Sequence, residues 1–145
     1  MLGVIISGHG GFASGMEKAM LQIVGQQEQV KAIDFPEEST SELLECQFKK
    51  AFTEVDSGDG VIFLTDLLGG TPFRTASMIA LAKQKVEVIT GCNLQMILES
   101  LLERDELTIN DFQDFSLASG HRGMTCLKDE LKKSKEPQKT DEDGI

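Results

Sequence analysis

Two glycine-containing loops of the sequence each carry one side chain that can do chemistry. The first loop, residues 7–11 (Ser-Gly-His-Gly-Gly), places His9 among glycines directly after an apolar segment. Glycines let the backbone turn sharply and approach an anion closely, and a neutral imidazole is a nucleophile. A helix after this loop would point its free N–H groups and positive dipole end at the same place. His9 is therefore a candidate phosphoryl acceptor, and its simpler alternative role is that of a turn or helix-cap residue.

The second loop, residues 66–72, begins with Asp66 and continues Leu-Leu-Gly-Gly-Thr-Pro. A carboxylate beside a histidine fixes the tautomer of the ring and stabilises the cation that forms when the ring is phosphorylated. Gly70 and Thr71, together with Gly10 of the first loop, could then hold the phosphoryl oxygens. Taken alone, Asp66 fits a turn or cap aspartate better, so the functional interpretation requires the two loops to lie side by side.

The elements around these loops alternate between strands and helices. Short apolar segments rich in β-branched residues predict strands, and apolar residues at helical spacing predict helices. We expect strands at residues 2–7, 30–35, 61–66 and 86–90, and helices at residues 12–24, after residue 39, up to about residue 82 following the second loop, and at residues 93–103 and 111–118.

This alternation predicts an α/β fold with a doubly wound, mostly parallel sheet and helices on both faces. A strand order of 2-1-3-4 makes the first and third strands neighbours, so the loops of His9 and Asp66 meet where the winding reverses. Two helix starts are also expected: Ser39 as the first residue of a capping box, and Thr71 as the N-cap of the helix after the second loop.

Composition restricts the functional classes. The 145 residues suit a single domain, and 14 Lys and Arg against 24 Asp and Glu give a net charge of −10, which disfavours nucleic acid as a partner. No apolar segment approaches 18 residues, and no signal peptide is recognisable. The three cysteines suit neither a disulfide framework nor a zinc site, so we expect a cytoplasmic protein.

A dinucleotide-binding module is the main alternative. Gly8, Gly10 and Ala13 match the Gly-x-Gly-x-x-Gly/Ala fingerprint, and Asp34 ends the second expected strand, where a ribose-binding acid would stand. Against this reading, the chain holds little more than one mononucleotide-binding half, and the fingerprint gives the loop of Asp66 no role.

Other site motifs are less consistent with the sequence. Residues 10–15 are spaced like a P-loop, but Met16 stands where the lysine is required. A receiver domain phosphorylated on Asp66 would need an acidic pair for Mg²⁺ after the first strand, where residues 7–9 read Ser-Gly-His. The second histidine, His121, is expected to be an exposed loop residue.

The motifs resemble those of a known family. The opening strand with residues 7–10, the stretch 60–73 and the stretch 88–93 are similar to the enzyme IIA domain of the mannose class of the bacterial sugar phosphotransferase system (PTS). The similarity covers roughly residues 1–131. It implies that His9 accepts a phosphoryl group from the phosphohistidine carrier protein and passes it to a histidine of enzyme IIB. Enzyme IIB then phosphorylates a sugar that enters through the membrane components.

The resemblance also implies roles for further parts of the chain. Asp66 matches the orienting carboxylate of the family, and Thr71 stands where the family has Ser or Thr near the phosphate. No metal or organic cofactor is expected. Residues 1–131 would form the IIA domain, and enzyme IIB would be a separate polypeptide. Residues 132–145 are polar and highly charged, and this composition predicts a flexible tail. The family forms homodimers, which implies that residues 123–127 form an antiparallel edge strand exchanged between subunits, although their own pattern is ambiguous between strand and helix.

Overall fold

Four parallel strands form the central sheet of the computed structural model, which describes residues 1–135. The strands are β1 (Gly3–His9), β2 (Val30–Phe35), β3 (Val61–Thr65) and β4 (Val86–Ile89). Their order is β2-β1-β3-β4, so the predicted order of 2-1-3-4 is confirmed. The change of winding direction falls between β1 and β3, as expected.

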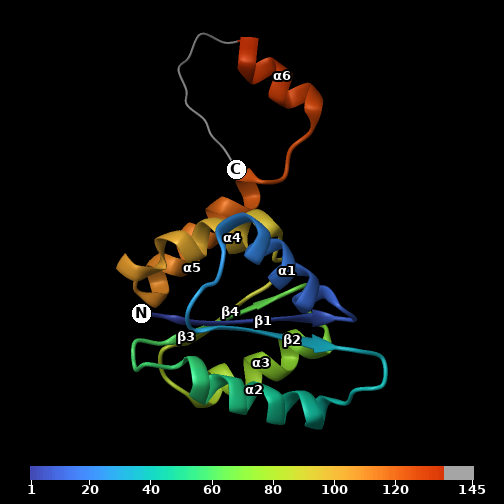
Figure 1. The fold of residues 1–145 in the computed structure, drawn as a ribbon, viewed down its shortest axis with the longest axis vertical. Coiled ribbons are helices and arrows are strands. Elements are labelled where there is room, and N and C mark those ends of the chain that lie inside the picture. The colour runs from blue at the N-terminus through green and yellow to red at the C-terminus, as the bar shows by residue number, and fades with distance from the viewer. Residues whose placement is uncertain (136–145) are drawn as a thin grey trace.

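Helices cover both faces of this sheet (Figure 1). The helices of the described residues are α1 (Phe12–Val24), α2 (Ser41–Val55), α3 (Thr71–Ala82), α4 (Leu94–Glu103), α5 (Ile109–Arg122) and α6 (Leu127–Lys135). Helices α2 and α3 lie on one face, and α1, α4 and α5 lie on the other, with a 3-10 turn (Arg104–Glu106) joining α4 to α5.

The alternation of side chains along the strands divides the core into two clusters. On β1, Ile5 packs against α2 and α3, whereas Val4 and Ile6 pack on the opposite face. The rings of Phe48 and Phe63 lie 5.1 Å apart between α2 and β3. Because β1 is buried on both faces, its continuous apolar sequence is that of a central parallel strand.

Two helix starts differ from those expected. The N-cap of α2 is Thr40, whose hydroxyl accepts a hydrogen bond from the Leu43 N–H (3.1 Å), so the capping box predicted at Ser39 is wrong by one residue. The N-cap of α3 is Gly70, so Thr71 is the first helical residue rather than the cap. This shift frees the Thr71 hydroxyl from a capping role.

The C-terminal part departs most from the expected pattern. Helix α5 extends to Arg122, and after a short irregular stretch α6 projects away from the sheet without burying any of its residues (Figure 1). Residues 124–126 form no strand in this single chain, so the exchanged edge strand and the dimer stay predictions. Residues 132–135 lie in α6, and the rest of the expected charged tail, residues 136–145, is outside the described residues.

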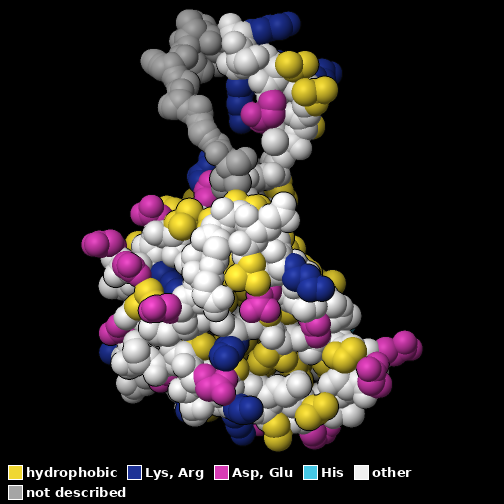
Figure 2. All heavy atoms as spheres, in the orientation of Figure 1, with side chains coloured by type: hydrophobic (Ala, Val, Ile, Leu, Met, Phe, Trp, Pro, Cys, Tyr) yellow, Lys and Arg dark blue, Asp and Glu magenta, His cyan; other side chains and the backbone are white. Residues whose placement is uncertain are grey.

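Both acidic and apolar side chains are exposed on the surface. Figure 2 shows Asp and Glu side chains scattered over the visible face, and apolar side chains on the main body as well as on α6. Leu127 and Leu131 of this helix are 74% and 52% exposed. No helix formed by residues 1–135 has both the length and the apolar character needed to cross a membrane.

Candidate active site

The carboxyl edge of the sheet brings the two glycine loops together. Strands β1 and β3 are paired neighbours with Ser7 opposite Thr65. His9 is the last residue of β1, and Asp66 directly follows β3. Both residues therefore extend from the ends of adjacent, fully hydrogen-bonded strands, which fixes their backbones more firmly than an isolated loop would.

The carboxylate of Asp66 holds His9 at two points. Its Oδ2 atom lies 2.8 Å from Nδ1 of the imidazole and accepts a second hydrogen bond of 2.8 Å from the His9 backbone N–H. Its Oδ1 atom accepts from the Leu67 N–H at 2.8 Å. Because a carboxylate only accepts, Nδ1 carries the ring proton, and the lone pair of the neutral ring lies on Nε2. The His9 side chain is 45% exposed and that of Asp66 only 12%.

The same contacts determine the ionisation of Asp66. Partial burial acts to raise the pKa of this carboxyl group, but the hydrogen bonds from His9 and Leu67 favour the charged form. The net result is a pKa below the usual value of 3.8. Asp66 is therefore an anion at neutral pH, able to stabilise positive charge on the imidazole.

The N-terminus of α3 lies against the free nitrogen of the ring. A Cβ atom at Gly70 would stand 2.6 Å from His9 Cε1 and 3.2 Å from Nε2, so only glycine leaves room for the imidazole. The first helical hydrogen bond runs from the Arg74 N–H to the Gly70 carbonyl (2.9 Å). The N–H groups of Thr71 and Phe73 consequently have no acceptor within the helix and can bind an anion at Nε2.

Glycines in the first loop allow the carboxyl ends of β1 and β3 to lie close together. A Cβ atom at Gly8 would lie 2.5 Å from the Phe12 ring and 2.9 Å from Cβ of Asp66. Gly10 has a φ of +57°, in the left-handed region, and donates its N–H to the Phe35 carbonyl (2.9 Å). Gly10 thus joins the loop to the end of β2, and its N–H is engaged within the protein.

Asp34, the acid required by the dinucleotide alternative, is used elsewhere. Its Oδ1 atom accepts a 2.8 Å hydrogen bond from the Ser14 N–H in the first turn of α1. A carboxylate at a helix N-terminus is stabilised by the helix dipole, which accounts for an acid at this position without a ribose ligand. The geometry therefore does not favour the dinucleotide-binding reading.

The other reactive side chains play no part in this arrangement. Cys92 follows β4, and burial together with the nearby charge of Asp66 raises its pKa to about 12, so the thiol stays protonated. His121 is exposed in the last turn of α5, a helix position rather than the expected loop. Within residues 1–135, no three His, Cys, Asp or Glu side chains are grouped so that they could hold a metal ion.

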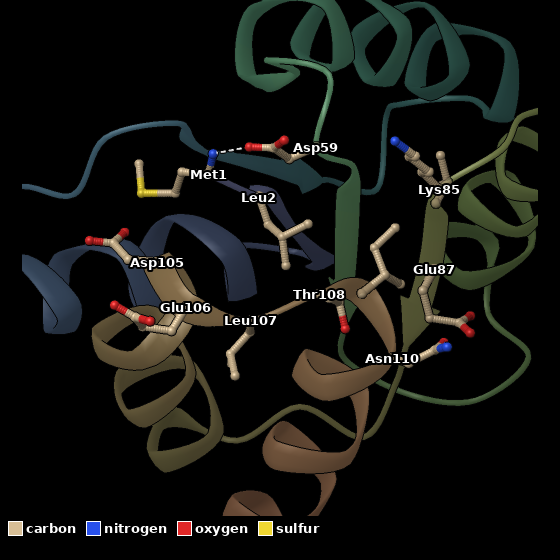
Figure 3. A pocket seen from close by; sticks show the side chains of 12 residues that line it. Met1, Leu2, Asp59, Lys85, Glu87, Asp105, Glu106, Leu107, Thr108 and Asn110 are labelled. Atoms are coloured by element: carbon tan, nitrogen blue, oxygen red, sulfur yellow. Dashed lines mark hydrogen bonds and ion pairs between the residues drawn. The ribbon is translucent and has the colours of Figure 1, made fainter.

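A cavity of about 710 Å³ lies at the amino ends of the strands, on the side of the sheet away from His9 and Asp66 (Figure 3). It is lined by residues near the amino ends of the strands, among them Met1, Asp59 and Lys85, and by the start of α5. The Met1 amino group forms an ion pair with Asp59 there. Because neither His9 nor Asp66 lines it, this cavity is separate from the candidate site.

Sequence reasoning missed one side chain beside the two loops. The guanidinium of Arg74, one turn into α3, donates a hydrogen bond to the Gly69 carbonyl and another to Thr71 Oγ1 (3.3 Å). The side chains of a helix point back toward its N-terminus, so a long cation at this position can reach the preceding loop. From the position of Arg74 one turn into the expected helix, this rule could have predicted that its side chain reaches the second loop.

The fold and site together define a class: a doubly wound α/β protein with an exposed histidine, held by a carboxylate, at its switch point. Residues 3–116 match the model of the family described as "PTS system fructose IIA component", and the chain belongs to this family. The resemblance to the mannose-class IIA components is thereby confirmed.

Individual relatives agree with this assignment. The chain is 34% identical over 128 residues to the PTS system mannose-specific EIIAB component of Escherichia coli (strain K12), covering 88% of this chain but only 40% of that protein. It is 29% identical to the PTS system fructose-specific EIIA component of Bacillus subtilis (strain 168), over 100% of both chains. The crystal structure of the phosphotransferase system component EIIA from Streptococcus agalactiae superposes with a TM-score of 0.83 at 30% identity, covering 89% of this chain and 99% of that one.

Proposed function

We propose that this IIA component acts as a phosphocarrier of a sugar PTS and that His9 carries the phosphoryl group. Membership of the family supports the phosphocarrier function. The observation that carries the assignment to His9 is its hydrogen bond with Asp66: Nδ1 is 2.8 Å from the carboxylate, which leaves Nε2 as the nucleophilic atom. That atom is also the one beside the N-terminus of α3.

Phosphoryl transfer at this site is an in-line displacement between two nitrogens. The lone pair of Nε2 attacks phosphorus, a new P–N bond forms, and the P–N bond to the donor histidine breaks. The imidazole gains positive charge, which the anionic Asp66 stabilises through the proton on Nδ1. Charge on the equatorial oxygens meets the N–H groups of Thr71 and Phe73 and the Thr71 hydroxyl.

The donor would be the phosphohistidine carrier protein, and the acceptor a histidine of enzyme IIB. The membrane components would take part only indirectly, and all of these steps would occur on the cytoplasmic side. Because both transfers join one histidine to another, the phosphorylated intermediate must not be bound too tightly. The surface position of His9, with its side chain 45% exposed, suits a site that partners reach and leave.

We also propose that the chain forms a homodimer through residues 123–127, as the family resemblance implies. Met124 and Leu127 are 65% and 74% exposed, and a partner subunit would bury this apolar surface. Light scattering on the full chain should give twice the monomer mass, and Leu127→Asp should shift the protein toward monomer. A monomeric mass for the wild-type chain at tens of micromolar would contradict the dimer.

Phosphate mapping tests the role of His9. Incubation with phosphoenolpyruvate and the general carrier proteins should give an adduct that is labile in acid and stable in alkali. His9→Ala should abolish this labelling, whereas the matched control His121→Ala changes the chain's other histidine and should be labelled at the wild-type level. Labelling of the His9→Ala variant would refute the assignment.

A further inference from the structure

The arginine on α3 holds two parts of the phosphate-facing loop at once. Its backbone N–H bonds the Gly70 carbonyl (2.9 Å), and its guanidinium returns to the Gly69 carbonyl and to Thr71 Oγ1 (3.3 Å). Arg74 therefore links Gly70, which lies beside the His9 ring, to the hydroxyl of the next residue, Thr71. Within residues 1–135, no other Lys or Arg side chain hydrogen-bonds to residues 66–71.

The guanidinium of Arg74 has no carboxylate partner among residues 1–135. The side chain is exposed, and no Asp or Glu of these residues forms an ion pair with it. Helix α3 also has no acidic residue in its first turn. A cation near the positive end of a helix dipole is unfavourable for the helix itself. In a chain of net charge −10, a cation at this position is complementary to an anion bound in front of α3.

We propose that Arg74 is a positioning residue for phosphoryl transfer, which orients the Thr71 hydroxyl toward the phosphoryl group on His9. The inference rests on the proposed function. The guanidinium donates to Thr71 Oγ1, so the hydroxyl accepts from Arg74 and keeps its own proton for a phosphoryl oxygen. The second donation, to the Gly69 carbonyl, fixes the loop on the N-terminal side of the same hydroxyl.

The planar fork of arginine is essential to this arrangement. Two acceptors, a backbone carbonyl and a side-chain hydroxyl, are served by the two terminal nitrogens of one group. A lysine ammonium is a compact point charge and does not present two donors in a fixed plane. Arg74→Lys therefore keeps the charge while it removes the geometry, and it separates orientation of Thr71 from simple attraction of anions.

A double-mutant cycle tests the coupling between the two side chains. The rate of phosphorylation of His9 by the phosphorylated carrier protein is measured for wild type, Arg74→Ala, Thr71→Ala and the double variant. Each single variant should be slower by about 10-fold, the effect of one hydrogen bond to a charged group. If Arg74 acts through Thr71, the double variant is no slower than the slower single variant. Losses that multiply would overturn the proposal.

Two further variants distinguish positioning from charge or structure. Thr71→Ser keeps the hydroxyl and should restore most of the rate, whereas Arg74→Lys should stay close to the rate of Arg74→Ala. Full rescue by lysine would mean that charge alone matters and would refute the role in positioning. The ³¹P chemical shift of the phosphohistidine should change in Arg74→Ala, and an unchanged shift would count against the inference.

The outcomes also separate this inference from the proposed function. If wild-type protein is not labelled on His9, the phosphocarrier assignment fails, and the positioning role fails with it. If wild type is labelled and Arg74→Ala reacts at the wild-type rate, only the role of Arg74 fails. Melting temperatures of all variants identify any rate loss that follows from unfolding.

Discussion

Gly70→Ala is the sharpest test of the geometry around His9. The added Cβ atom would lie 2.6 Å from His9 Cε1, whereas carbon atoms in contact lie about 3.5–4.0 Å apart. The ring must therefore move by roughly 1 Å. A misplacement of this size between reacting groups lowers rates by about 100-fold. The backbone itself accepts alanine, because φ at Gly70 is −78°.

The variant should fold almost normally while losing activity. Alanine is a poorer N-cap than glycine, which costs the helix up to about 1 kcal/mol and lowers the melting temperature by about 2–4 °C. Rapid-quench measurement of phosphoryl transfer from the carrier protein, at saturating donor, gives the rate of the chemical step. Gly15→Ala is the matched control: it lies in α1, has nothing within 4 Å of an added Cβ atom, and should keep the wild-type rate.

A wild-type rate for Gly70→Ala would contradict the reasoning. It would mean that the imidazole does not react from the position beside the N-terminus of α3, since alanine cannot share that space with the ring. If both Gly70→Ala and Gly15→Ala lowered the melting temperature strongly and equally, the fold would be destabilised by any added methyl group near a helix N-terminus, and the rate loss would not report on His9. Only a loss of rate specific to Gly70→Ala agrees with the structure.

Three other predictions concern the groups around the sheet ends. Asp66→Asn should slow phosphorylation by about 10- to 100-fold with the fold retained, because the amide keeps an acceptor but not the charge beside the imidazole; unchanged kinetics would exclude Asp66 from the mechanism. The stabilisation from ionised Asp66, whose pKa is depressed in the fold, should be complete above about pH 4 and disappear as pH falls through that pKa; urea titrations should show this acid loss diminished in Asp66→Asn. Arg104→Met should lower the free energy of unfolding by about 3 kcal/mol, since buried Arg104 donates to the Leu2 carbonyl (3.0 Å) and the Gln29 carbonyl (3.4 Å); a loss below about 1 kcal/mol would contradict this.

The order of the sheet and the meeting of the two loops were predictable from the sequence. Apolar, β-branched segments recur between helical patterns, and this alternation leaves few topologies open. Once β1 and β3 are neighbours, His9 and Asp66 have to emerge at the same edge. The assignment of ring nitrogens needed the structure, because it depends on the 2.8 Å contact between Nδ1 and the carboxylate.

Features that depend on particular contacts were not predictable from the pattern. Arg104 is only 2% exposed although arginine is usually a surface residue, and backbone carbonyls rather than a carboxylate accept its hydrogen bonds. The N-cap of α2 is Thr40 rather than the predicted Ser39, a difference of one residue that local propensity cannot resolve. Helix α6 buries none of its residues, so no packing against the sheet selects between the strand and helix readings of its pattern.

Only one ring nitrogen of His9 is accessible, and this limits how partner proteins can use the site. Nδ1 is occupied by Asp66, so under the proposed function Nε2 alone would serve both the protein that delivers the phosphoryl group and the protein that removes it. The two partners would have to bind one after the other, and an excess of either one in its unproductive state would compete for the site and slow sugar uptake.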